Sequence, residues 1–108
     1  KSGNLWVASS PKILEYAASS LSASGSPAPA MTLTLPSGAS SPETSGIAFD
    51  ESGDLWYLDT FNAAIGEYTA AQLAGGGSPL PTVTLTNSAN FYGEGLAFNP
   101  HPSAVPLH

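Results

Sequence analysis

The chain has 108 residues, of which 42% are hydrophobic, so it has the length of one small domain and enough apolar residues for a packed core. Charged residues make up only 9%, and 2 Lys and Arg stand against 8 Asp and Glu, for a net charge of -6. This balance argues against a nucleic-acid partner and against anionic membrane surfaces, because both need clustered basic residues. The chain has no cysteine, which excludes disulfides and thiolate metal sites.

Targeting signals are not visible in the chain. No apolar run approaches the roughly 20 residues needed to span a bilayer, so we expect no membrane insertion. No signal-peptide pattern is visible either. Polarity comes from hydroxyl groups rather than charges, which favours a secreted or cell-surface protein. Because Lys1 opens the chain inside a repeat, we expect a fragment or a processed piece.

The second half of the chain repeats the first. Gly3–Trp6 returns as Gly53–Trp56, and Ile13–Tyr16 returns as Ile65–Tyr68, each about 50 residues later. The matching segments come in the same order in both halves. A period of this size indicates an array of supersecondary units rather than one irregular domain.

The first repeat predicts three strands. Leu5–Ala8 is a continuous apolar run, typical of a strand that is buried on both faces. After the bend Ala8–Lys12, Ile13–Tyr16 begins to alternate in polarity. A Ser-, Ala- and Pro-rich connection, residues 17–30, leads to Met31–Leu35, which alternates with period two. Burial is therefore expected to decrease from the first of these strands to the last.

The second repeat predicts four strands. Gly46–Phe49 is followed by the tight-turn sequence Asp50–Asp54 and by Leu55–Leu58, the counterpart of the first apolar run. Ile65–Tyr68 and Val83–Thr86 complete the repeat. The order of burial expected for these strands is the same as in the first repeat.

Two smaller elements complete the prediction. Ala70–Ala74 predicts one helical turn, which Gly75–Gly77 stops. Gly95–Phe98 repeats Gly46–Phe49 and predicts a further strand. No long amphipathic helix is visible, which disfavours mixed α and β repeats such as leucine-rich repeats or ankyrins.

Four short antiparallel strands in a repeat of about 40 to 50 residues are the pattern of β-propeller blades. With the strands of a blade named A to D, the chain reads B-C-D, A-B-C-D, A. We therefore predict an all-β fold with two blade equivalents. Residues 1–45 hold strands B to D of a first blade, 46–94 form a second blade, and 95–108 hold strand A of a following blade and a tail. Two blades cannot close a ring, so we expect partner blades from a longer chain or from a homo-oligomer.

Gly46–Trp56, which reads Gly-Ile-Ala-Phe-Asp-x-x-Gly-Asp-Leu-Trp, resembles the blade signature of NHL-repeat propellers. It is similar also to streptogramin-lyase and gluconolactonase-like propellers. Asp59–Ile65 matches the Asp-x-x-Asn-x-x-Ile bend of the family. The resemblance implies the fold and leaves the activity open, because these families include enzymes, ligand binders and protein-interaction modules. The bend Ala8–Lys12 departs from the pattern, and Ala64 replaces a common basic residue, so RNA binding is not carried over.

In propellers, the D–A and B–C loops share the face that usually binds ligands. We therefore predict a ligand-binding surface at this end of the blades. Two adjacent aromatic residues in a Gly-flanked loop are its most informative part, although packing of that loop on the next blade also explains them. The predicted residues are Glu43, Thr44, Ser45, Phe61, Asn62, Phe91, Tyr92 and Glu94.

Other candidates have adequate structural explanations. Trp6 and Trp56 recur at matching positions, which favours packing between blades over a stacking platform for a sugar or base. Asp59 and Asn62 offer only two oxygen donors, fewer than calcium requires, and can bond the backbone of their own bend. Asp50–Asp54 resembles part of a calcium loop, but a hairpin turn explains it. No metal site is predicted.

No Ser lies in a Gly-x-Ser-x-Gly elbow, and no convergent acid–base pair is visible. We predict a structural or ligand- and protein-binding propeller segment that acts without a cofactor, with a small molecule, a glycan or a protein as its ligand. The alternative is part of a metal-dependent lyase or lactonase-like enzyme, to which Glu43 or Glu94 would contribute. A third interpretation is a self-assembling unit, of which three or four copies form a six- or eight-bladed ring. The ligand and the blade number stay open.

Overall fold

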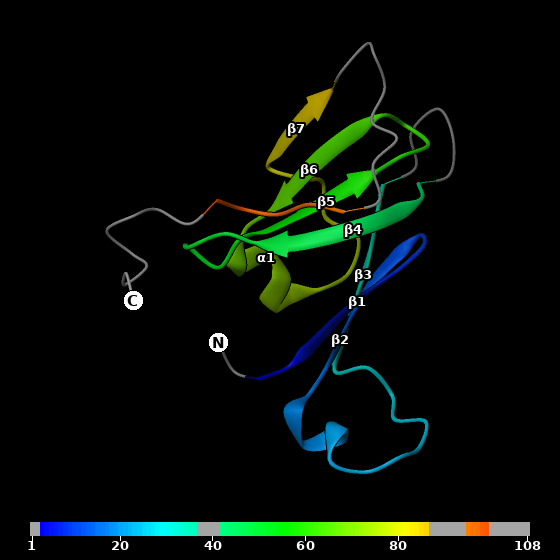
Figure 1. Cartoon of the computed structure of the whole chain (residues 1–108). Coiled ribbons are helices and arrows are strands. Elements are labelled where there is room, and N and C mark those ends of the chain that lie inside the picture. The colour runs from blue at the N-terminus through cyan, green and yellow to red at the C-terminus, as the bar shows by residue number, and fades with distance from the viewer. Residues whose placement is uncertain (1–2, 37–41, 87–94, 100–108) are drawn as a thin grey trace.

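The computed structural model describes residues 3–36, 42–86 and 95–99. Within these ranges the chain forms two antiparallel sheets, of three and four strands, with one short α-helix (Figure 1). The predicted all-β class is confirmed, and the described strands close no ring or barrel. Across the same ranges, no helix has the length and apolarity to cross a membrane.

The first sheet contains β1 (Leu5–Ser9), β2 (Lys12–Tyr16) and β3 (Met31–Thr34), in chain order. β1 and β2 form a hairpin in which Trp6 lies opposite Glu15. A 3-10 turn, Ala18–Leu21, begins the long connection to β3. All three predicted strands of this repeat are therefore confirmed. The expected order of burial is wrong for this sheet, because β1 lies at its edge and has no buried residue, whereas Leu33 of β3 is fully buried.

The second sheet contains β4 (Thr44–Phe49), β5 (Leu55–Asp59), β6 (Ala64–Tyr68) and β7 (Val83–Thr86), also in chain order. The four predicted strands are confirmed, although β4 begins at Thr44, two residues before the predicted start. Its pairing with β5 is irregular there, between Thr44 and Gly46. A bulge of this kind at a strand end is a common way to re-aim side chains.

Gly95–Phe98 differs from its prediction as a strand. Residues 95–99 have no ladder partner among the described residues, and no strand is assigned to them. A strand is defined by backbone pairing, which its own sequence pattern cannot provide. Phe98 nevertheless packs on Trp56, with ring centroids 6.1 Å apart. The segment is therefore held on the second sheet by side-chain contact.

The helix α1 (Ala70–Gly75) confirms the predicted helical turn, and a capping box explains its start. Gln72 N donates to Thr69 Oγ1 at 3.2 Å, and Thr69 N donates to Gln72 Oε1 at 2.9 Å. Gly76, with φ of 61°, follows the last helical residue. In the first repeat Ala17 precedes the 3-10 turn and offers no side-chain cap. The capped connection of the second repeat therefore forms an α-helix, whereas the uncapped connection of the first repeat forms a 3-10 turn.

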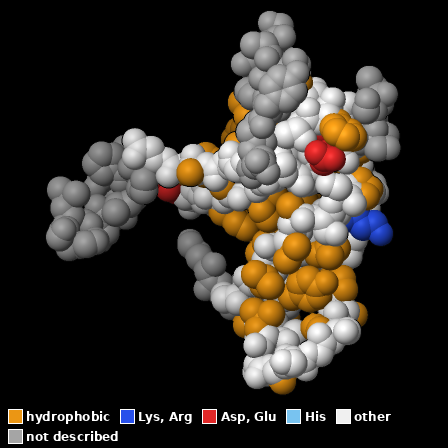
Figure 2. Space-filling view, turned by 45° about the vertical axis from the view of Figure 1, so that its right-hand side comes forward, with side chains coloured by type: hydrophobic (Ala, Val, Ile, Leu, Met, Phe, Trp, Pro, Cys, Tyr) orange, Lys and Arg blue, Asp and Glu red, His pale blue; other side chains and the backbone are white. Residues whose placement is uncertain are grey.

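The main core lies between the two sheets and under α1. Its fully buried members come from both sheets, as shown by Ile13 and Leu33 of the first and Leu55 and Tyr68 of the second. Leu73 of α1 closes this core from one side. Figure 2 shows one face of the molecule, on which hydrophobic side chains form a broad band and charged side chains are few.

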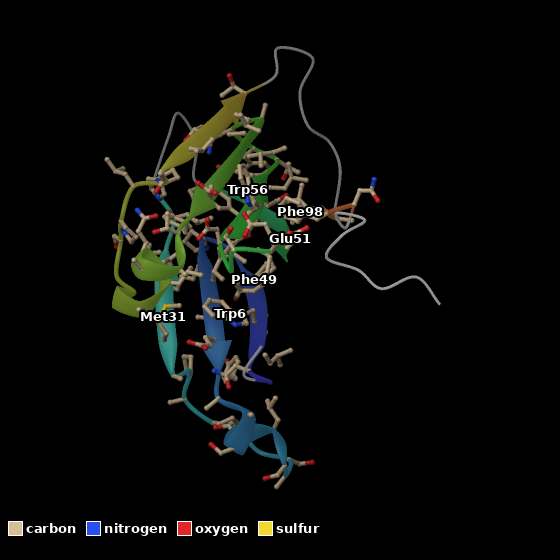
Figure 3. The ribbon with its side chains drawn as sticks, turned by 90° about the vertical axis from the view of Figure 1, so that its left-hand side faces the viewer. Trp6, Met31, Phe49, Glu51, Trp56 and Phe98 are labelled. Atoms are coloured by element: carbon tan, nitrogen blue, oxygen red, sulfur yellow. The ribbon has the colours of Figure 1, made fainter. Side chains whose placement is uncertain are left out.

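The same aromatic contact occurs twice, one repeat apart. The Trp6 ring of β1 meets Phe49 of β4 edge-on, with centroids 5.1 Å apart. Trp56 meets Phe98 in the same way, with an interplanar angle of 65° against 72° for the first pair. Figure 3 shows each tryptophan facing its phenylalanine. Both tryptophans thus pack on the following repeat, as their recurrence predicted.

Candidate binding site

Asp59, at the end of β5, organises one end of the second sheet. Its Oδ1 accepts hydrogen bonds from Glu43 N at 3.1 Å and Asn62 N at 3.3 Å, and its Oδ2 accepts one from Asn62 Nδ2 at 2.7 Å. The Asp59 side chain is only 5% exposed. One buried carboxylate thus ties the entry to β4 to the turn between β5 and β6.

A second link joins the same two segments. Thr60 N donates to Glu43 O at 3.1 Å. The Thr60 hydroxyl lies 3.3 Å from Glu43 O and 3.2 Å from Glu43 Oε1, and it can donate to one of them at a time. The Glu43 side chain is exposed. Its carboxylate therefore keeps accepting capacity on the solvent side.

Thr44 connects this end of the second sheet with the first sheet. Its N–H donates to Ser10 Oγ at 2.8 Å, and Ser10 Oγ lies 3.4 Å from Thr44 O. The Thr44 side chain is 7% exposed, and its hydroxyl has no hydrogen-bond partner among the described residues. Ser45 follows it in β4 and is half-buried.

Phe61 lies in the turn between β5 and β6 and is 63% exposed. The backbone on both sides of it is held, by Thr60 bonded to Glu43 and by Asn62 bonded to Asp59. A large apolar ring thus stands in water on a fixed turn. We call this surface the loop end: Glu43, Thr44, Asp59, Thr60, Phe61 and Asn62.

The loop end brings together part of the predicted ligand surface. Glu43, Thr44, Phe61 and Asn62 lie on it, with Ser45 next to it in β4. Asp59 and Thr60 were not in the predicted set. The Asp-x-x-Asn pattern of the bend marks Asp59 in the sequence, whereas nothing local marks Thr60. The remaining predicted residues, Phe91, Tyr92 and Glu94, fall outside the described residues.

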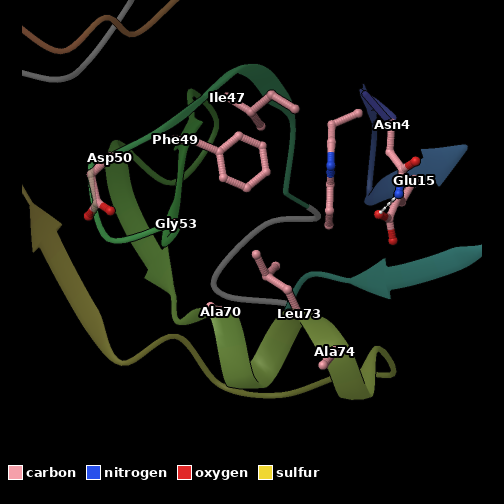
Figure 4. A pocket seen from close by; sticks show the side chains of 10 residues that line it. Asn4, Glu15, Ile47, Phe49, Asp50, Gly53, Ala70, Leu73 and Ala74 are labelled. Atoms are coloured by element: carbon pink, nitrogen blue, oxygen red, sulfur yellow. Dashed lines mark hydrogen bonds between the residues drawn. The ribbon is translucent and has the colours of Figure 1, made fainter. Parts of the chain in front are cut away.

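A cleft of about 660 Å³ opens between the two sheets, and sequence analysis did not predict it (Figure 4). Its walls are largely apolar, with Trp6 and Phe49 on facing sheets and Leu73 below. Asn4 and Glu15 stand at its polar side, and Asn4 Nδ2 donates to Glu15 Oε2 at 2.7 Å. Because the Asn4 amide and the Glu15 carboxylate are hydrogen-bonded to each other, the cleft offers a ligand mainly apolar surface.

Three acidic side chains converge near the turn between β4 and β5. Asp50, Asp54 and Glu67 place one carboxylate oxygen each within 4.8 Å of the others. Asp50 Oδ1 accepts from Ser52 N and Asp54 N, which confirms the structural explanation of this turn. Three such ligands are fewer than the six or more that calcium takes.

The charges of this acidic cluster affect one another. The Trp56 indole donates to Asp50 Oδ2 at 3.0 Å and lowers the pKa of that carboxyl, with backbone N–H groups acting in the same direction. Glu67 is half-buried, and its desolvation, together with the negative charges of Asp54 and Asp50, raises its pKa. In the first sheet Asn4 stands where Asp54 stands in the second, and no such repulsion arises.

Comparison with protein-family models, with curated proteins and with solved structures found no match to this chain. The family resemblance therefore depends on Gly46–Trp56 and Asp59–Ile65 alone.

Proposed function

We propose that the two sheets are neighbouring blades of a β-propeller of the NHL type, and that the chain is a non-enzymatic binding scaffold in it. The aromatic contact that recurs from Trp6–Phe49 to Trp56–Phe98 is the observation that carries this proposal. A propeller repeats one packing of sheet on sheet around its axis. The antiparallel strands, which follow chain order in both sheets, support the same assignment.

The loop end is the ligand surface in this proposal. Binding residues are commonly placed on loops that a rigid scaffold positions. Here the buried Asp59 carboxylate and the Thr60–Glu43 bonds hold the turn that carries Phe61. An exposed aromatic ring on a fixed turn loses little conformational entropy when a ligand covers it.

The chemistry of the loop end suits an uncharged glycan. The C–H face of a sugar ring can stack on Phe61, while its hydroxyls need nearby acceptors and donors. Glu43 is exposed and supplies a carboxylate acceptor with unused lone pairs, and Thr60 supplies a hydroxyl. The net charge of -6 disfavours acidic sugars as ligands.

A glycan array tests this proposal with immobilised neutral glycans as probes. We expect the wild-type chain to bind a subset of them and Phe61→Ala to lose at least about tenfold in affinity, equal to about 1.4 kcal/mol. Leu80→Ala is the matched control, because Leu80 is 73% exposed and lies in the connection to β7. Equal binding by wild type and Phe61→Ala, or no binding by the wild type, would overturn the glycan assignment.

Adding a metal chelator to the same experiment distinguishes the binding scaffold from the metal-dependent enzyme. A scaffold that acts without a cofactor binds glycans equally well when the chelator is present. Hydrolysis or elimination of a bound glycan that stops on chelation would favour the lyase or lactonase-like alternative instead.

A further inference from the structure

β1 has one open edge. It pairs with β2 on one side, and no strand pairs with its other side among the described residues. The corresponding strand of the second sheet, β5, pairs on both sides, with β4 and with β6. An open edge presents a row of unpaired N–H and C=O groups, which is a template for another strand.

The sequence of the strand that would fill this edge is present in the chain. Gly95–Phe98 repeats Gly46–Phe49, which is the β4 segment that pairs with β5. Gly95–Phe98 has no ladder partner among the described residues, and yet Phe98 lies on Trp56 as Phe49 lies on Trp6. The segment is therefore positioned on the second sheet but has backbone groups to offer.

β1 and Gly95–Phe98 of the same molecule cannot pair with each other. Ala48 lies opposite Trp56 in the ladder, so both side chains point to the face that Phe98 covers. Phe49 is the next residue and points to the opposite face, where it meets Trp6. The second sheet thus stands between β1 and Gly95–Phe98. Gly95–Phe98 can therefore reach the open edge of β1 only from a second molecule.

We propose that β1 of one copy of this chain pairs antiparallel with Gly95–Phe98 of a second copy. The proposal builds on the propeller packing above, and the contact continues the sheet-on-sheet interface that the chain already makes within itself. The ladder between β4 and β5 supplies the register, since it sets Gly46, Ile47, Ala48 and Phe49 opposite Leu58, Tyr57, Trp56 and Leu55. Applied to Gly95–Phe98 and β1, this register places Gly95 opposite Ala8, Leu96 opposite Val7, Ala97 opposite Trp6 and Phe98 opposite Leu5.

The indole of Trp6 supports the same pairing. Trp56 Nε1 donates to Asp50 Oδ2, and Asp50 is the residue after Phe49. Trp6 Nε1 has no hydrogen-bond partner among the described residues. Asn99 follows Phe98 as Asp50 follows Phe49, and its side-chain oxygen can accept a hydrogen bond. In the proposed pair, Asn99 of the second copy comes within reach of the Trp6 indole.

Such a contact joins two different surfaces, so it is heterologous and leads to a closed ring or an open filament. Each junction would complete the first sheet of one copy with a fourth strand. The stability of that sheet then depends on protein concentration, because association and folding are linked.

Engineered disulfides test the register, because the chain has no cysteine of its own. Val7→Cys and Leu96→Cys are made as separate single variants, mixed and oxidised mildly. Directly opposite residues in an antiparallel ladder have Cα atoms about 4.5–5.5 Å apart, within the range of a disulfide. We expect a covalent dimer of one chain of each variant. Val7→Cys mixed with Ala97→Cys is the control, since a shift by one residue turns the side chain to the other face.

A disulfide yield for Val7→Cys with Leu96→Cys no greater than for the control pair would overturn the proposal. The mass of the wild-type chain in solution gives a second readout that needs no variant. We expect multiples of 10.9 kDa, as one discrete species for a closed ring or as a series that grows with concentration for a filament, and a folded monomer at all concentrations would contradict the pairing. Coupling between Trp6 and Phe49 within the monomer would show that the propeller packing holds and that only the pairing between copies fails.

Discussion

The Trp6 and Phe49 rings meet edge-on, with ring centroids 5.1 Å apart, and connect β1 of the first sheet to β4 of the second. We expect Phe49→Ala to lower the free energy of unfolding by about 1–2 kcal/mol, less than for a buried Phe because Phe49 is 40% exposed. In a double-mutant cycle with Trp6→Ala, the coupling should reach about 0.5–1.5 kcal/mol by urea denaturation. Phe61→Ala is the matched control and should change stability little. Additive effects of the two substitutions would contradict the contact.

Asp59→Asn tests whether one carboxylate holds the loop end. The substitution keeps the shape but removes the charge and brings an amide donor toward the N–H groups of Glu43 and Asn62. We expect a loss of about 2 kcal/mol in the free energy of unfolding, with faster hydrogen exchange at these two amides. Glu43→Gln serves as control, because this exposed side chain should tolerate the change within about 0.5 kcal/mol. Equal exchange rates in Asp59→Asn and wild type would argue against the role of Asp59.

Gly66 is required by the ring of Tyr57, its neighbour across the ladder. A Cβ at Gly66 would overlap that ring, which is itself stacked on Tyr68 with centroids 5.4 Å apart. We expect Gly66→Ala to cost about 1–3 kcal/mol, measured by chemical denaturation, because the core is overpacked.

The first sheet offers the compensating change for Gly66. Its corresponding ladder pair is Val7 opposite Leu14. The larger side chain of the pair therefore lies on β2 in the first sheet, whereas it lies on β5 in the second sheet. Tyr57→Val combined with Gly66→Leu should therefore be more stable than the sum of the two single substitutions predicts. If the double variant shows no such gain, the pair does not share one space.

The acidic cluster makes stability depend on pH. Partial burial and the charges of Asp54 and Asp50 raise the pKa of Glu67 in the folded state, so the folded chain binds a proton more tightly than the unfolded chain. The contribution of Glu67 to stability is therefore present below its unfolded pKa and is lost as pH rises through its raised folded pKa.

Asp54→Asn copies the arrangement of Asn4 in the first sheet, where the side-chain amide donates to Glu15. We expect a higher Tm at neutral pH and a smaller loss of stability between about pH 4 and pH 7 than in the wild type. Thermal unfolding across this pH range measures both effects. An unchanged pH profile would mean that Asp54 does not repel Glu67.

The sequence by itself determined the seven strands, their order and the helical turn. Each of these depends on signals a few residues apart. The period-two alternation of Met31–Leu35 and the apolar run Leu55–Leu58 specify strands, and the pair Thr69 and Gln72 caps α1. The repeat also predicted that Trp6 would pack on the following unit, since matching positions in a repeated array meet matching neighbours.

Tertiary structure decided the rest. Gly95–Phe98 carries the same pattern as Gly46–Phe49 but forms no strand, because pairing depends on a partner edge and not on the segment itself. The loop end depends on Asp59 receiving N–H groups from Glu43 and Asn62, and the cleft depends on how two sheets meet. These features join residues from separate segments. Only their three-dimensional packing brings the donors, acceptors and apolar surfaces within the few ångströms over which such contacts act.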